Sequence, residues 1–124
     1  MRRLRHSDQL FLRRPWAVPS TAGLDTFGPL YVCRGDTIHF EWVSGDPDGK
    51  HGVAQLRAGA TPCDMSGSQT LAQPSDGGSC SVNVWADKGS SVYYVDPVGD
   101  HCKRGQFVQV IVSNRTDIDC PSNN

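Results

Sequence analysis

Four side chains of metal-binding type gather around one loop and one earlier position in the sequence. Asp96, His101 and Gln106 follow one another at intervals of five residues, and His51 stands well before them. This spacing suits a loop that leaves one strand, covers a pocket and enters the next strand, with a side chain presented at its start, middle and end. Two imidazoles and a carboxylate are ligands for copper and zinc. Because single histidines are also common at protein surfaces, a loop without a metal stays open as the alternative.

The elements that flank these residues have the pattern of strands. Residues 91–95 are rich in Tyr and Val, and residues 106–113 place alternate valines on one face, so each segment predicts a strand with the ligand-bearing loop between them. A loop rich in Gly, Asp and Pro, residues 44–50, precedes a further predicted strand at 52–58. His51 is therefore expected at the junction between that loop and that strand.

The clearest strand pattern lies in residues 37–43. Ile38, Phe40 and Trp42 alternate there with polar side chains, which is the period of two expected of a strand with one buried face. Further strands are predicted at 9–13, 30–32 and 79–85. Residues 61–78 are expected to form one long polar connection. Seven or eight short strands joined by Gly- and Pro-rich turns, without a helical pattern, predict an all-β Greek-key sandwich.

Length and charge narrow the class of protein. A chain of 124 residues is the size of a single domain, and 12 basic against 13 acidic residues provide no field that would hold nucleic acid or an anionic membrane. No apolar stretch reaches the length of a membrane span. We expect a flexible basic tail at residues 1–8, a domain at 9–114 and a polar tail at 115–124, in a protein that is a monomer.

The number of cysteines indicates the compartment in which the protein is found. Five cysteines in so short a chain are typical of an oxidising compartment, and one of them must stay unpaired within a monomer. In a secreted protein, Asn114 of the sequence Asn-Arg-Thr would accept a glycan. Residues 1–20 contain arginines but lack the apolar core of a signal peptide, so no export signal is visible and the role of this segment stays open. A secreted or cell-surface location is expected.

The ligand-bearing loop resembles that of a known family. Residues 93–106 read YYVDPVGDHCKRGQ. They are similar to the metal loop of the phytocyanins, a family of cupredoxins, in which an aromatic pair precedes a cysteine, a His-Cys pair follows, and Gly precedes Met or Gln. Residues 35–42 resemble the family's Gly-Asp strand, and residues 51–53 resemble its His-Asn-Val. The similarity ends at Val112, and it begins at either Trp16 or Leu30.

The resemblance implies a cupredoxin-like β-sandwich in which His51 and His101 are the imidazole ligands of a copper ion. It also implies that Gln106 is the weak axial ligand, as in stellacyanin-like proteins, and that Cys63 and Cys102 form a disulfide. A free Cys102 thiol stays open as an alternative, because the odd cysteine count leaves one thiol unpaired. The resemblance assigns no partner to Cys33, Cys80 or Cys120.

Asp96 stands where the family has its ligating cysteine. The bond from copper to a thiolate gives a blue copper protein its colour and an efficient electronic path, and Asp96 cannot form that bond. A carboxylate is a harder donor that favours Cu(II) over Cu(I), so a copper ion held by this set is expected to be non-blue and to have a lower potential. The same donors suit zinc.

These observations predict a copper-binding protein of the electron-transfer class rather than an enzyme, with a redox protein or a cell-surface component as its partner. The alternative is a metal-free sandwich similar to the early nodulin-like relatives of the family, which would act as a structural or recognition module at the cell surface. A copper-dependent oxygenase is disfavoured, because secreted copper monooxygenases use an N-terminal histidine and this chain opens with Met1.

Overall fold

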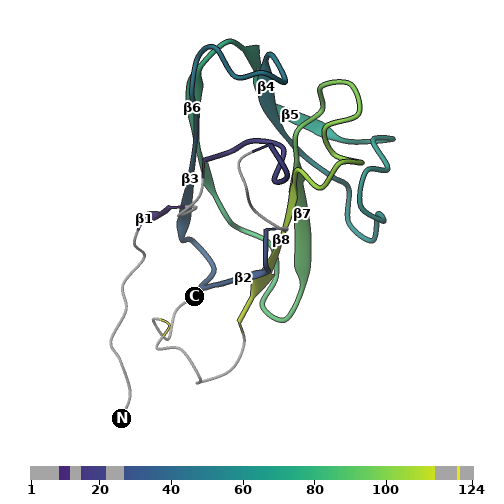
Figure 1. Ribbon diagram of the computed structural model, residues 1–124. Helices are drawn as coiled ribbons and strands as arrows, with labels where there is room; N and C mark the ends of the chain where they lie inside the picture. The colour runs from purple at the N-terminus through teal and green to yellow at the C-terminus, as the bar shows by residue number, and fades with distance from the viewer. Residues whose placement is uncertain (1–8, 12–14, 22–26, 114–119, 121–124) are drawn as a thin grey trace.

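The structure is a computed structural model that describes residues 9–11, 15–21, 27–113 and 120. These residues form eight strands and no helix (Figure 1). The strands are β1 (Gln9–Phe11), β2 (Leu30–Val32), β3 (Thr37–Trp42), β4 (His51–Gln55), β5 (Gln69–Ser75), β6 (Gly78–Asn83), β7 (Ser91–Val95) and β8 (Phe107–Val112). No helix in the described part of the chain has the length and hydropathy needed to cross a membrane.

The strands form two sheets that face each other as layers (Figure 1). The smaller sheet has the order β1-β3-β6, and the larger sheet has the order β2-β8-β7-β4-β5. β1 runs parallel to β3 and β2 runs parallel to β8, whereas the other pairs are antiparallel. The predicted all-β sandwich is confirmed.

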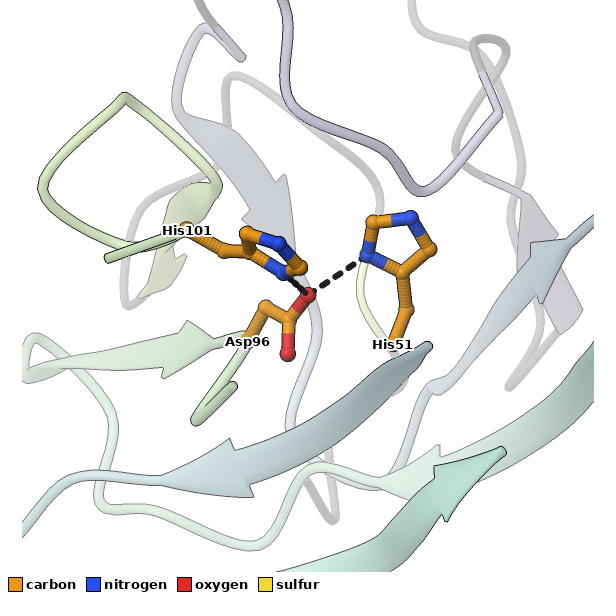
Figure 2. Close-up of side chains that lie close together, drawn as sticks. All are labelled: His51, Asp96 and His101. Carbon is orange, nitrogen blue, oxygen red and sulfur yellow. Dashed lines mark hydrogen bonds and ion pairs between the residues drawn. The ribbon is translucent and has the colours of Figure 1, made fainter. Parts of the chain in front are cut away.

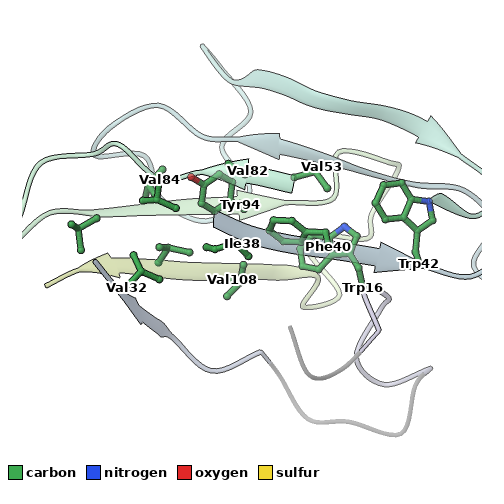
Figure 3. Close-up of a cluster of buried hydrophobic side chains, with 13 residues drawn as sticks. Trp16, Val32, Ile38, Phe40, Trp42, Val53, Val82, Val84, Tyr94 and Val108 are labelled. Carbon is green, nitrogen blue, oxygen red and sulfur yellow. The ribbon is translucent and has the colours of Figure 1, made fainter. Parts of the chain in front are cut away.

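The core lies between the layers and follows the alternation of β3. Ile38, Phe40 and Trp42 are buried, as predicted, and point toward the larger sheet (Figure 3). The Phe40 ring lies 4.9 Å from the Trp16 ring and 5.9 Å from the Tyr94 ring, measured between centroids. Aromatic rings at this separation contribute beyond the area that they bury. Trp16, which precedes the first long strands, is therefore part of the core.

The predicted polar connection at residues 61–78 is wrong in one respect, because it contains the strand β5. β5 pairs antiparallel with β4 at the edge of the larger sheet, and no residue in it is fully buried. Its sequence therefore lacks the alternation that marks a strand with one buried face. Pro74 lies within this strand. Proline has no backbone N–H to donate, and it is tolerated in an edge strand where that N–H would face solvent and not a partner strand.

Two disulfides fasten the sandwich. Cys63 is bonded to Cys102, which joins the connection before β5 to the loop between β7 and β8. Cys33 is bonded to Cys120, a pairing that the sequence left unassigned, and Cys80 is the free thiol. Two bonds of this kind agree with an oxidising compartment.

Some sequence predictions fall outside the described residues. Asn114, the predicted glycan acceptor, is one of them, as are residues 1–8 and nearly all of 115–124. The proposed division into two tails and a domain stays a prediction.

Candidate metal centre

Two neighbouring strands bring the candidate ligands together. β4 begins at His51, and the antiparallel β7 ends at Val95, so Asp96 enters the next loop beside the start of β4. That loop, residues 96–106, returns to β8 and carries His101. Figure 2 shows His51 projecting from β4 and His101 projecting from the loop, with Asp96 between them.

Both imidazoles converge on one carboxylate oxygen. Asp96 Oδ2 lies 2.6 Å from His51 Nδ1 and 2.8 Å from His101 Nδ1 (Figure 2). The candidate ligand atoms of the three residues all lie within 4.8 Å of one another, and all three residues are buried. Two imidazole nitrogens and one carboxylate oxygen at such separations form a donor set that Cu(II) or Zn(II) accepts.

The second oxygen of Asp96 is held by the backbone. Asp96 Oδ1 accepts hydrogen bonds from the amide of Gly52 at 3.2 Å and from the amide of Val98 at 3.0 Å. These two donors fix the plane of the carboxylate, so Oδ2 stays directed at the histidines. The Asp96 amide donates to the Gln106 carbonyl at 3.1 Å, which closes the base of the loop.

Two further residues, which sequence reasoning missed, touch the outer edges of the imidazoles. His51 Nε2 lies 3.4 Å from Asp46 Oδ2, and His101 Nε2 donates to the backbone carbonyl of Asp48 at 3.1 Å. The only signal for them was their place in the Asp-rich loop directly before His51. Both ring nitrogens of His101 thus face an oxygen acceptor. An imidazolium satisfies both contacts, and so does a neutral ring whose Nδ1 binds a metal ion in place of a proton.

The charges around His51 favour its protonated form. Burial alone lowers the pKa of His51, but the hydrogen bond to Asp96 and the negative charges of Asp96 and Asp46 outweigh burial, so the pKa is raised above its ordinary value. The same negative charges stabilise any cation held between the imidazoles.

Gln106 is fully buried at the end of the loop. Its amide donates to the His101 carbonyl at 3.0 Å, and its own carbonyl accepts from Asp96. Neither polar atom of its side chain has a hydrogen-bond partner among the described residues. A buried carboxamide without a partner is costly, and such groups in native proteins usually serve a ligand, an ion or a water molecule.

Comparison with known proteins identifies the fold. No family model and no curated protein matches the chain. An auracyanin from the photosynthetic bacterium Roseiflexus castenholzii superimposes with a TM-score of 0.53 at 14% identity, over 86% of this chain and 95% of the other. Spinach plantacyanin gives 0.52 at 14% identity, over 85% and 99%. Auracyanin B gives 0.51 at 12% identity, over 90% and 92%.

These neighbours are cupredoxins, so the predicted cupredoxin-like β-sandwich is confirmed. At such identities the likeness concerns the fold alone. The choice of the phytocyanin branch and the alignment of Asp96 with a ligating cysteine stay predictions.

Proposed function

We propose that this protein is a copper-binding protein of the cupredoxin type in which Asp96 replaces the thiolate ligand. His51, Asp96 and His101 would hold the ion, with Gln106 as a weak fourth ligand. The observation that carries the proposal is the convergence of two buried imidazole Nδ1 atoms on one carboxylate oxygen. The partnerless carboxamide of Gln106 supports it further.

The residues of the site would hold the ion, orient one another as its ligands and keep water out. The two backbone amides on Asp96 Oδ1 orient the carboxylate, and the Asp48 carbonyl on His101 Nε2 leaves the Nδ1 of that ring directed inward. Burial keeps bulk water from the donors. A bound copper ion would supply one-electron redox chemistry, and with a carboxylate in place of a thiolate the Cu(II) state would be favoured and the intense blue absorption absent.

The proposal extends to the class and the location of the protein. Soluble electron carriers share this fold, and we assign the chain to the electron-transfer class rather than to the enzymes. The two disulfides support a secreted or cell-surface location. We propose a monomer whose partner is a redox protein or a cell-surface component, with zinc as the other metal that the donors suit.

A Cu(II) titration of the metal-free protein, followed by electron paramagnetic resonance, tests the proposal. One copper per chain is expected, with nitrogen couplings that disappear in His51→Ala and His101→Ala. His39→Ala is the matched control, because His39 contacts Ser81 and Glu41 on another part of the sandwich. Binding that all four proteins share equally would refute the site.

One observation favours a second candidate, a metal-free structural or recognition module. The Nδ1 atoms of both histidines are already hydrogen-bonded to Asp96, at 2.6 and 2.8 Å. A hydrogen-bonded network of this kind can stabilise a buried polar cluster without an ion. Absence of specific copper and zinc binding by the wild-type protein would support this module and exclude the metal-binding function.

A further inference from the structure

The loop of residues 44–50 covers the outer edges of both site histidines. Asp46 Oδ2 faces His51 Nε2, and the Asp48 carbonyl accepts from His101 Nε2. With this loop in place, His51 is 0% exposed and His101 is only 5% exposed. Reagents in solution reach neither Nε2 atom unless this loop moves.

An ion pair fastens the loop to the other side of the site. Arg104 Nη1 donates to Asp48 Oδ1 at 2.9 Å, and Arg104 belongs to the same loop as His101. The Asp48 side chain is 11% exposed and the Arg104 side chain is 40% exposed. The pair therefore spans the two loops that enclose the site, and it is sheltered from water on the Asp48 side.

The covering loop has a defined shape of its own. Asp46 Oδ1 accepts the Asp48 amide at 2.8 Å, and the Asp46 carbonyl accepts the Gly49 amide at 2.9 Å. Gly49 adopts a φ of +88°, which glycine allows without strain. The Gly45 amide donates to Asp76 Oδ1 at 2.9 Å, at the turn between β5 and β6. These bonds hold the backbone in one conformation while the cover is closed.

Little of the loop is buried. Most of residues 44–50 are exposed, and a pocket of about 250 Å³ is bordered by Asp46 and Pro47 and, from the domain, by Trp16 and Val43. Segments with little apolar burial open at the low end of the range of local stabilities. Polar contacts, above all the Asp48 to Arg104 pair, remain to keep it closed.

We propose that residues 44–50 act as a cover over the histidine pair and that the ion pair between Asp48 and Arg104 controls its opening. Asp46, Asp48 and Arg104 are then positioning residues that set how fast a metal ion enters and leaves. The statement about metal exchange rests on the proposed function, whereas the statement about access to the imidazoles does not.

Histidine modification by diethyl pyrocarbonate, read residue by residue by mass spectrometry, tests the cover without any metal. Asp48→Asn, Arg104→Gln and the double variant should each raise the modification rate of His51 and His101 by about two- to fivefold, the range expected for loss of one ion pair. The double variant should match Asp48→Asn, because Arg104 acts on this loop through Asp48, whereas Asp48→Asn also weakens the contact of Asp48 with Thr21. His39 should react equally in all proteins.

Arg57→Gln is the matched control, since Arg57 Nη2 pairs with Asp64 Oδ2 at 2.8 Å beyond the end of β4. It should leave the rates unchanged. Equal rates in the wild type and in the Asp48 and Arg104 variants would overturn the cover. Stopped-flow uptake of Cu(II) should accelerate in parallel. If the wild type binds no Cu(II) while the variants still expose the histidines, the cover stands and the proposed metal function fails.

Discussion

His51 Nδ1 and Asp96 Oδ2 are joined at 2.6 Å across the junction between β4 and the end of β7. The contact links two segments that the sheet pairing places side by side, and both side chains are fully buried. The polar centre of the site is thus built at the start of β4 and directly after the end of β7, and the following loop adds His101 to it. Substitutions at these positions are expected to change the stability of the fold together with the proposed metal binding.

Asp96→Cys should convert the site into a blue or green copper centre. The cysteine would place a thiolate between the two imidazoles, and a bond from Cu(II) to a thiolate produces an intense visible charge-transfer band. Absorption spectroscopy after addition of Cu(II) checks this, with Asp96→Ser as the control that should stay pale. A cysteine variant that binds Cu(II) and yet shows no such band would argue against the alignment of Asp96 with the family's cysteine.

Asp96→Asn should destabilise the metal-free protein by about 3 to 5 kcal/mol, the usual cost of removing one partner from a buried charge pair. The variant leaves two buried imidazoles facing an uncharged amide. Urea unfolding followed by tryptophan fluorescence measures the change. Asp64→Asn, at an exposed ion pair, should change the free energy of unfolding far less than Asp96→Asn does. Equal stability of both variants would contradict a stabilising role for Asp96.

The raised pKa of His51 gives the metal-free protein a defined pH dependence. Since the folded-state pKa lies above the ordinary value of 6.5, the stabilisation is fully present below about pH 6.5 and is lost as the pH rises through the folded-state pKa. Copper affinity should change in the opposite direction, because the metal must displace the proton. Thermal unfolding at several pH values tests the first part, and His51→Gln should flatten the curve. A wild-type curve without this slope would contradict the assignment.

Gly52→Ala should distort the site through the backbone. A Cβ at this position would lie 2.8 Å from the Ala72 carbonyl oxygen on β5, so β4 must shift, and overpacking of this kind costs about 1 to 3 kcal/mol. The shift would also move the amide that orients Asp96. Gly28→Ala is the control, because a Cβ there meets nothing within 4 Å. Comparison of urea midpoints decides the point, and equal midpoints would refute it.

Loss of the disulfide between Cys63 and Cys102 should cost about 2 to 5 kcal/mol of stability, as in other small disulfide-bonded domains. Cys63→Ser measures this cost in chemical unfolding. Cys80→Ser is the natural control, because Cys80 is the free thiol. If both variants unfold at the wild-type midpoint, the disulfide does not support the fold.

The sequence predicts the fold where one chemical pattern dominates. Ile38, Phe40 and Trp42 alternate with polar residues, and the structure buries all three. The spacing of Asp96, His101 and Gln106 likewise matches a loop between two strands, because a short excursion returns close to where it left. Local periodicity and loop length are properties of the sequence itself, so both can be read from it.

What the sequence does not predict depends on contacts between distant segments. β5 lies at a sheet edge and has no fully buried residue, since even Leu71 and Ala72, which pack against the core, are only half-buried, so burial imposes no alternation on it. The contacts of Asp46 and Asp48 with the imidazoles depend on how a turn packs across the site. The bond between Cys33 and Cys120 depends on where two remote segments meet, since five cysteines alone allow many pairings.

That bond has a mechanical consequence. Cys33 and Cys120 are 87 residues apart, and the covalent ring that they close contains every strand from β3 to β8. A pulling force applied to the chain outside this ring would pass through the sulfur atoms and not through the hydrogen bonds between these strands. Tension of that kind would stretch β1 and β2 away from the domain and leave the segments that carry His51, Asp96 and His101 at their resting length.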